Sequence, residues 1–386
     1  MAFPVQTRDV TASLHPRRAN GATHPAVGRK RWSWGTFLKW TACAIAVAFL
    51  VRALMQADLP RAVARIGEAG PAVALIVLPF LVSIALDATA CRLLFAAIGR
   101  RARFEQLLAV RLTAEAVNMS LPAGGVWSES LNPLLLNRRC GIPGSEAVAG
   151  MAAKKWLQMR GHGLYIFASV AVGFGFLSSH SRAIVGFDGL PWIVLASGCV
   201  PLALSVMLAG SLARGALVEK THALLRKLPS LRLRAWLDER RHHFVATDSL
   251  FGRIATSRTT ELAASPLFLA SWLIESVETL VILRVLGVPI GFIEVLSFEA
   301  GLSLLRNFAF FAPAGLGVQD LGYMAYLGAL GYPGAASLGA AFVLLKRAKE
   351  IFWIVIGYAL FLLVRARATP DGASQSPPPA SIEAAP

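Results

Sequence analysis

Several ionisable side chains, and two asparagines with them, lie inside segments that are otherwise apolar. A charge at membrane depth is costly, and it usually faces a cavity or a charged partner. Together these side chains could line one polar cavity suited to binding a charged group. The candidates are Asp87, Glu115, Asn118, Glu129, Glu278, Arg306, Asn307 and Asp320, with Glu275 and Glu299 in the same set. The alternative for each is a structural ion pair, as for Glu115 with Arg111 or Glu299 with Arg306 at helical spacings.

Arg306 is the candidate best suited to an anion. A guanidinium stays charged and offers a planar fork that matches a phosphate. Glu299 lies two helical turns earlier, about 10 Å along the axis, which is long for a direct pair. Glu115 is therefore the favoured protein partner. We expect Arg306→Ala to abolish the handling of an anionic group and Arg306→Lys to restore it only in part.

The sequence contains none of the common catalytic patterns. GxSxG, HExxH and the Walker loop are missing, and the glycines near 124 and 315 follow no predicted strand. The cysteines, at 43, 91, 140 and 199, form no CxxC or Cys/His cluster, which predicts neither a disulfide framework nor a zinc site. His162 is interpreted as an interface residue rather than a base. We expect no enzymatic activity, no catalytic residue, no cofactor and no metal.

The composition indicates a helical integral membrane protein. Hydrophobic residues make up 55% of the chain and charged residues only 16%, whereas soluble proteins carry about 25% charged residues. Apolar runs near the length of a transmembrane helix favour helices over a barrel. The net charge is +16, but the basic residues lie at the ends of apolar runs. This placement favours the positive-inside rule and anionic lipids over nucleic acid.

The order of polar and apolar segments predicts an all-α polytopic protein of a cell inner (plasma) membrane with both termini cytoplasmic. Residues 1–33 are expected to form a disordered basic tail rather than a signal peptide, and 365–386 a disordered C-terminal tail. The transmembrane domain covers 34–364, with 213–261 as amphipathic cytoplasmic helices or, alternatively, a solvated loop. Residues 56–70 are expected to be an outer loop. Full spans are expected at about 35–55, 71–91, 161–179, 190–212, 264–285 and 338–364.

A Pro-Ala-Gly break followed by an acidic residue occurs twice. Glu129 and Asp320 are 191 positions apart, as are Asp87 and Glu278. Small-residue segments then end at Lys154-Lys155 and at Lys346-Arg347. The helix-break residues are Pro122, Gly124 and Gly125 in the first unit and Pro313, Gly315 and Gly317 in the second.

Each break separates two short helices, 104–121 from 126–137 and 290–312 from 315–330. Such broken backbone is tolerated when it is buried in protein or lines a cavity. The duplication predicts two inverted repeats, at about 71–179 and 262–364, each a span, a broken re-entrant hairpin and a second span. Paired broken helices point to a site near the midplane, so Glu129 and Asp320 should face a shared interior.

The breaks, Glu129, Asp320 and Lys346-Arg347 together resemble the lysylphosphatidylglycerol synthase transmembrane family, also called flippase-like or UPF0104 proteins, over about 35–364. Asp87-x-x-x-x-Arg92 with Glu115-Ala-Val-Asn118 is similar to its hopanoid-biosynthesis-associated branch. The resemblance implies movement or handling of a polar lipid. The soluble aminoacyl-transferase domain of the full synthases is absent from this sequence, so synthase activity is not implied. The family often has Glu-Arg and Asp where this chain has Lys154-Lys155 and Gln158.

Three functions are compatible with these observations. The first is flippase-like transport of a lipid with a polar or anionic head group, and the resemblance suggests a hopanoid-related lipid. The second is an accessory membrane subunit whose segment 213–261 recruits a lipid-modifying enzyme. The third is a secondary transporter of a small solute. The partners expected are membrane lipids and, in the second case, a lipid-biosynthesis enzyme.

Overall fold

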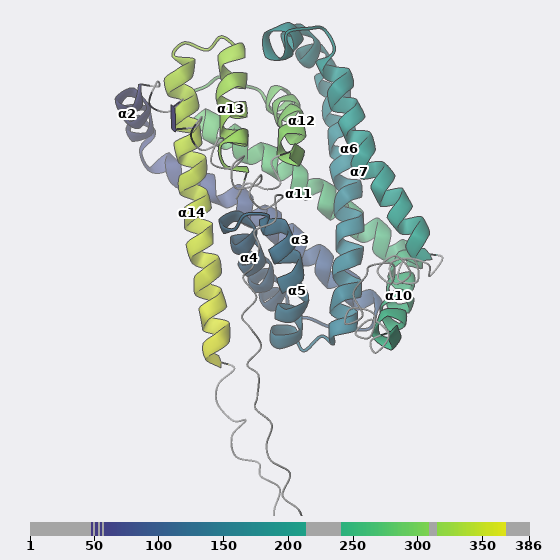
Figure 1. Ribbon diagram of the computed structural model, residues 1–386. Coiled ribbons are helices and arrows are strands. Elements are labelled where there is room, and N and C mark those ends of the chain that lie inside the picture. The colour runs from purple at the N-terminus through teal and green to yellow at the C-terminus, as the bar shows by residue number, and fades with distance from the viewer. Residues whose placement is uncertain are drawn as a thin grey trace, which may run out of the picture.

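The computed structural model describes residues 58–213, 241–308 and 315–367, with a few isolated positions between 48 and 55 (Figure 1). Within these ranges every regular element is a helix. Most of the predicted span at 35–55, the N-terminal tail, the C-terminal tail beyond residue 367 and most of the segment 213–261 lie outside the described residues. The all-α class predicted from the sequence is confirmed for the part of the chain that the structure describes.

The described chain begins with three consecutive helical elements: α2 (Leu59–Ala69), the 3₁₀ helix η1 (Gly70–Val77) and α3 (Leu78–Ala97). The sequence predicted a loop over 56–70, and that prediction is wrong for α2. The Asp58 side chain accepts a hydrogen bond of 3.1 Å from the Arg61 amide, and Pro60 occupies the first turn. These are ordinary helix-starting features, since an N-cap acid satisfies an amide that has no partner inside the helix.

Two helical hairpins correspond to the predicted broken pairs. The first consists of α4 (Phe104–Ser120) and α5 (Gly124–Cys140), and the second of α12 (Phe292–Phe308) and α13 (Val318–Ala329). Figure 1 shows α4 and α5 in the lower part of the molecule and α12 and α13 in the upper part, beside opposite ends of α14 (Ala335–Arg367). The inverted orientation of the two units in a membrane stays a prediction.

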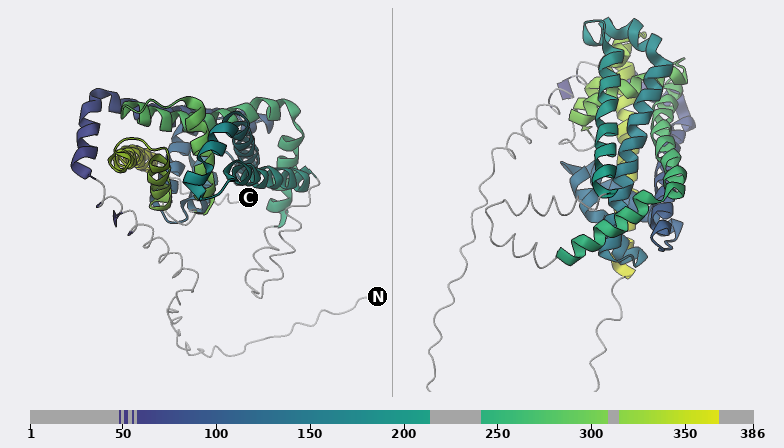
Figure 2. Two further views of the ribbon diagram at one scale, coloured as in Figure 1. Left: turned by 90° about the horizontal axis from the view of Figure 1, so that it is seen from above. Right: turned by 90° about the vertical axis from the view of Figure 1, so that its right-hand side faces the viewer.

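The helix α6 (Gly144–Val185) runs without interruption past Lys154-Lys155 and through the predicted span 161–179. Its 42 residues correspond to about 63 Å, twice the hydrocarbon thickness of a bilayer. It packs against α7 (Leu190–Ala213), and the two helices run side by side in both Figure 1 and Figure 2. The two lysines that close the repeated small-residue segment therefore lie within one continuous helix.

Four helical segments of the described chain are long and apolar enough to cross a membrane: Leu59–Ala97, Gly144–Val185, Leu190–Gly210 and Arg258–Val285. They contain most of the predicted spans 71–91, 161–179, 190–212 and 264–285. The last of the four is α11 (Arg258–Val285), which follows α10 (Arg241–Thr256). The predicted span 338–364 lies within α14, a helix of 33 residues that carries Lys346, Arg347, Lys349 and Glu350.

Two apolar clusters hold the two halves together. One surrounds Phe95, Leu157 and Phe268, and the other surrounds Phe298, Tyr323 and Phe342. The helices α3 and α11 pack extensively against each other, and the Ser83 and Ser271 hydroxyls join them at 2.7 Å. Polar residues interrupt the apolar packing between these clusters.

Candidate functional site

A cavity of about 330 Å³ lies among the two hairpins and the long helices. Its wall takes residues from eight helices: α3, α4, α5 and α6 from the first unit and α11, α12, α13 and α14 from the second. The charged residues of the wall are five basic and six acidic: Arg111, Lys154, Lys155, Lys346 and Lys349, with Glu115, Glu129, Glu275, Glu278, Glu299 and Glu350. A single polar cavity therefore receives side chains from both halves of the chain.

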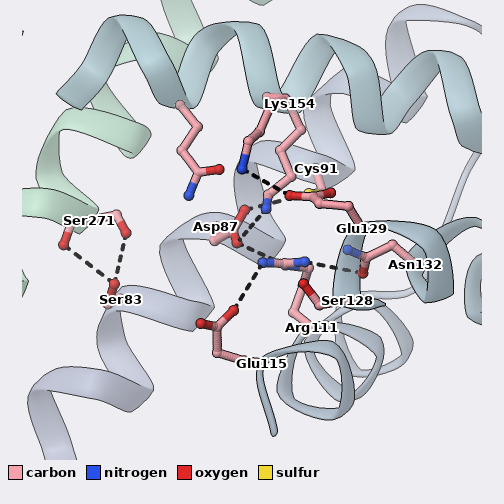
Figure 3. Close-up of polar contacts among 12 residues, drawn as sticks. Ser83, Asp87, Cys91, Arg111, Glu115, Ser128, Glu129, Asn132, Lys154 and Ser271 are labelled. Atoms are coloured by element: carbon pink, nitrogen blue, oxygen red, sulfur yellow. Dashed lines mark hydrogen bonds and ion pairs between the residues drawn. The ribbon is translucent and has the colours of Figure 1, made fainter. Parts of the chain in front are cut away.

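On the side of the first unit, the cavity wall rests on a buried charge network around Asp87 (Figure 3). The Asp87 carboxylate accepts from Arg111 Nε at 2.8 Å and lies 3.3 Å from Lys154 Nζ. Its side chain is 7% exposed, and that of Lys154 is 1% exposed. Asp87 does not line the cavity. It positions Arg111 and Lys154, which do line it.

Arg111 connects several acceptors through its guanidinium fork. Besides Asp87, it donates to Asn132 Oδ1 at 3.1 Å, and its Nη2 lies 3.7 Å from Glu115 Oε2. Asn118 donates to Glu115 at 2.7 Å. Figure 3 shows the guanidinium lying between the carboxylates of Asp87 and Glu115. A planar fork with several acceptors is held in one orientation, which a lysine cannot reproduce.

On the side of the second unit, Glu278 takes the place of Asp87. Its carboxylate lies 2.6 Å from Lys349 Nζ and 3.3 Å from Lys346 Nζ, and all three side chains are nearly inaccessible. Lys349 Nζ also lies 5.2 Å from the centre of the Phe80 ring. Nearby, Glu299 accepts hydrogen bonds from Tyr323 at 2.8 Å and from Thr279. Each of these buried charges therefore has a compensating neighbour, as burial requires.

The ion pairs of the two units occur at matching positions. Glu278 follows Asp87 by 191 positions, Lys346 follows Lys154 by 192, and each acid lies 3.3 Å from its lysine.

A second correspondence involves the acids after the breaks. Glu129 pairs with Lys155 at 3.2 Å, and Asp320 pairs with Arg347 at 2.7 Å. Asp320 follows Glu129 by 191 positions and Arg347 follows Lys155 by 192. The duplication read from the sequence thus extends to the contacts, since four residues of one unit repeat the pairing of the other.

The first break is a sharp turn at residues 121–123. Ala123 has φ 53°, a left-handed conformation that is strained for a residue with a side chain. A Cβ added to Gly124 would lie 2.0 Å from the carbonyl oxygen of Asn118, so only glycine allows the two helices to approach so closely. Pro122 and Gly125 complete the turn, and Gly125 lines the cavity.

The second break is described only from residue 315, and Pro313 lies outside the described residues. Gly315 and Gly317 both have positive φ, 66° and 85°. The Gly317 amide donates to Asp320 Oδ2 at 2.9 Å, so Asp320 caps the first turn of α13. Its other oxygen accepts from Arg347, and the residue is fully buried. Asp320 supports the break rather than forming part of the described cavity wall.

The structure brings most of the predicted site residues together. Glu115, Asn118, Glu129, Glu278, Gly124, Gly125 and Gly315 line the cavity. Asp87 and Asp320 are buried behind it, each bound to a basic residue. The side chains of Arg306 and Asn307 lie outside the described residues, so the predicted partner of Arg306 stays a prediction. Arg111 instead contacts Glu115.

Sequence reasoning missed the lysines as cavity residues. It noted Lys154-Lys155 and Lys346-Arg347 only as the ends of the repeated small-residue segments and did not assign them to the cavity. A signal was present: Lys346 and Lys349 are three residues apart, which places them on one helix face. Gln319 and Glu350 also line the wall and were missed. Among the described residues, no cluster of His, Cys, Asp and Glu is arranged to hold a metal ion.

A comparison with known families finds one match. The model of the family described as the lysylphosphatidylglycerol synthase TM region matches residues 37–365, which is most of the chain. A comparison with curated proteins finds no match.

Proposed function

Because this chain belongs to the lysylphosphatidylglycerol synthase TM region family, we propose that it moves a polar lipid between the leaflets of a bilayer. In this function, the cavity takes the head group while the apolar part of the lipid stays in the hydrocarbon. The protein is a multi-pass membrane protein with several apolar helices. The proposal adds the transport step and the site at which it occurs.

One observation carries the proposal: a single charged cavity is lined by both halves of the chain, between two broken hairpins. Ionisable groups at membrane depth are costly and are typical of pathways for polar substrates. Helix breaks near the middle of a membrane are typical of transporters. A cavity lined by two similar halves presents a related ion pair from each half, which suits movement between leaflets.

The balance of charges indicates how a head group would bind. Each described lysine or arginine of the wall contacts a carboxylate, so an arriving phosphate must compete with an internal partner. The pair of Lys155 and Glu129 is the most exposed of these, with side chains 45% and 33% accessible. A head group would exchange with this pair first. The lysines paired with Asp87 and Glu278 would then contact a head group that has already been desolvated.

We further propose that the protein acts as a transporter and not as an enzyme, in a cell inner membrane with both termini cytoplasmic. Basic clusters at 29–31, 100–103, 213–258 and 365–367 support this orientation through the positive-inside rule. The hopanoid-related substrate is retained as the finer proposal, because of the spacing of Asp87, Arg92, Glu115 and Asn118.

Purified protein reconstituted into liposomes tests this function. The probes are a fluorescent phosphatidylglycerol and a fluorescent polyhydroxylated hopanoid, each placed in one leaflet, and the readout is the fraction that a membrane-impermeant quencher reaches. Movement above the protein-free rate, with no soluble protein added, is the expected result.

Two outcomes oppose the proposal. Lipid movement that requires an added lipid-modifying enzyme would support the accessory-subunit alternative. Uptake of a water-soluble head group, such as glycerophosphoglycerol, without movement of the lipid would support a transporter of small solutes.

A further inference from the structure

A second pocket adjoins the polar cavity at the first helix break. Its volume is about 540 Å³, and its wall is formed by the start of α5 and one lysine of α6. The residues that line it are Ala123, Gly125, Val126, Glu129, Ser130 and Lys155. We call it the α5 groove.

The α5 groove and the polar cavity share part of their walls. Gly125, Glu129 and Lys155 line both. The ion pair of Lys155 and Glu129, 3.2 Å long and partly exposed, therefore stands at the boundary between the two spaces. Gly125 also lies at this boundary. Because it has no side chain, only its backbone stands between the groove and the cavity there.

Away from the boundary, the α5 groove is apolar. Val126 is 65% exposed, and the neighbouring Trp127 is 57% exposed. The hydroxyl of Ser130 donates to the Val126 carbonyl at 2.8 Å, so its proton is used within the helix. A wall of this kind offers hydrocarbon contacts and no strong anchor for a polar ligand, whereas the shared pair offers both charges.

We propose that the α5 groove holds a hydrocarbon chain of the lipid whose head group occupies the polar cavity. This inference rests on the proposed function and adds the place where the lipid enters. An amphipathic molecule requires a charged space and an apolar space that meet, and these two meet at Lys155 and Glu129. The head group crosses this pair while its chain remains along α5.

The small residues of the break suit this path. Ala123 keeps a strained left-handed φ of 53° at the groove, and Gly125 lines both spaces. A large side chain introduced at Val126 would fill the groove from a position that lines the groove and not the polar cavity.

Photo-crosslinking of the full chain in liposomes tests the inference. One probe is phosphatidylglycerol with a diazirine in its acyl chain, and the other is the methyl ester of the same diazirine fatty acid. The readout is the ratio of the two probes' crosslinks at residues 123–130, located by mass spectrometry. The exposed residues Val206 and Leu262, which line neither space, serve as reference positions.

The expected result is a preference for the phospholipid probe at 123–130 and equal labelling by both probes at the reference positions. Val126→Trp should abolish this preference. Val148→Trp, at an exposed valine of α6 that lines neither space, should keep it. Size-exclusion profiles and unfolding temperatures show whether both variants fold.

Equal labelling by the two probes at 123–130 in the wild-type protein would overturn the inference, as would a preference unaffected by Val126→Trp. Lipid movement in the quenching assay without preferential labelling would refute the groove and leave the proposed function intact. Preferential labelling without lipid movement would support the groove as a lipid site and refute transport.

Discussion

Asp87 balances the two buried positive charges of the first unit. It contacts Arg111 and Lys154, and both of its partners are almost inaccessible. A buried ion pair contributes little net stability, but removal of one member leaves an uncompensated buried charge. The cost of losing Asp87 should therefore greatly exceed the cost of losing an exposed acid.

We expect Asp87→Asn to lower the free energy of unfolding by about 3–5 kcal/mol, because Arg111 and Lys154 lose their shared carboxylate. Asp188→Asn is the matched control, since Asp188 pairs with Arg182 at the surface, where exposed pairs contribute about 0–1 kcal/mol. Thermal unfolding in detergent measures both. Adding Lys154→Gln to Asp87→Asn should recover part of the loss. Equal stability of Asp87→Asn and Asp188→Asn would show that Asp87 is not needed to balance these cations.

Alanine substitutions at Arg306 and at Arg111 are expected to differ in their effects on stability. Arg111→Ala should reduce both stability and lipid movement, because Arg111 compensates Asp87. Arg306→Ala should abolish lipid movement while the protein still inserts and expresses, and Arg306→Lys should restore movement only in part. The quenching assay and the unfolding temperature separate the two effects. Lipid movement at the wild-type rate in Arg306→Ala would show that the head group does not contact Arg306.

At the scale of elements, the turn between α4 and α5 depends on one glycine. A Cβ at Gly124 would lie 2.0 Å from the Asn118 carbonyl oxygen, whereas a Cβ at Gly125 would lie 3.7 Å from its nearest neighbour. The two positions are adjacent and chemically identical, so they provide a matched pair.

We expect Gly124→Ala to destabilise the protein by about 1–3 kcal/mol, the usual cost of forcing atoms into a packed site. Gly125→Ala should be close to neutral, and it should even gain slightly from helix propensity. Unfolding temperatures in detergent measure both changes. A loss at Gly125→Ala as large as that at Gly124→Ala would contradict the described packing of the turn.

The breaks could be predicted from the sequence because their signals are local. Pro122, Gly124 and Gly125 mark the turn within a few residues, and the helices on either side begin and end close to the predicted positions. The place of Lys154 beside the cavity could not be predicted in this way. Lys154 is stabilised inside a helix by Asp87, which lies 67 positions earlier, and only the folded chain reveals that partner.

The candidate site was also predicted only in part, because some of its residues have local sequence signals and others do not. Acidic residues inside apolar segments are conspicuous, so Glu115, Glu129 and Glu278 were found. The basic partners Lys346 and Lys349 lie far along the chain in α14, and only the folded chain brings them to Glu278. The depth of Asp320 also depends on Arg347, 27 positions later in α14.

At the scale of the whole molecule, the orientation in the membrane is the first test. Cysteine labelling from outside intact cells should reach residues 181–189 and fail at 226–241, since the basic segment 213–258 favours the cytoplasmic side. In the structure the first of these regions is the end of α6 and the turn that leads to α7, with Arg182 and Asp188 exposed. Labelling of 226–241 in intact cells would reverse the proposed orientation.

The central claim is that the cavity shared by the two units carries the head group of a lipid. The rate of lipid movement in liposomes, compared between Glu278→Gln and Arg182→Gln, tests it most directly, because the first change alters the cavity wall and the second an exposed pair. We predict a rate at least about tenfold below wild type for Glu278→Gln, equivalent to about 1.4 kcal/mol, and an unchanged rate for Arg182→Gln. Wild-type rates in both folded variants, or no movement above protein-free liposomes by the unmodified protein, would contradict the claim.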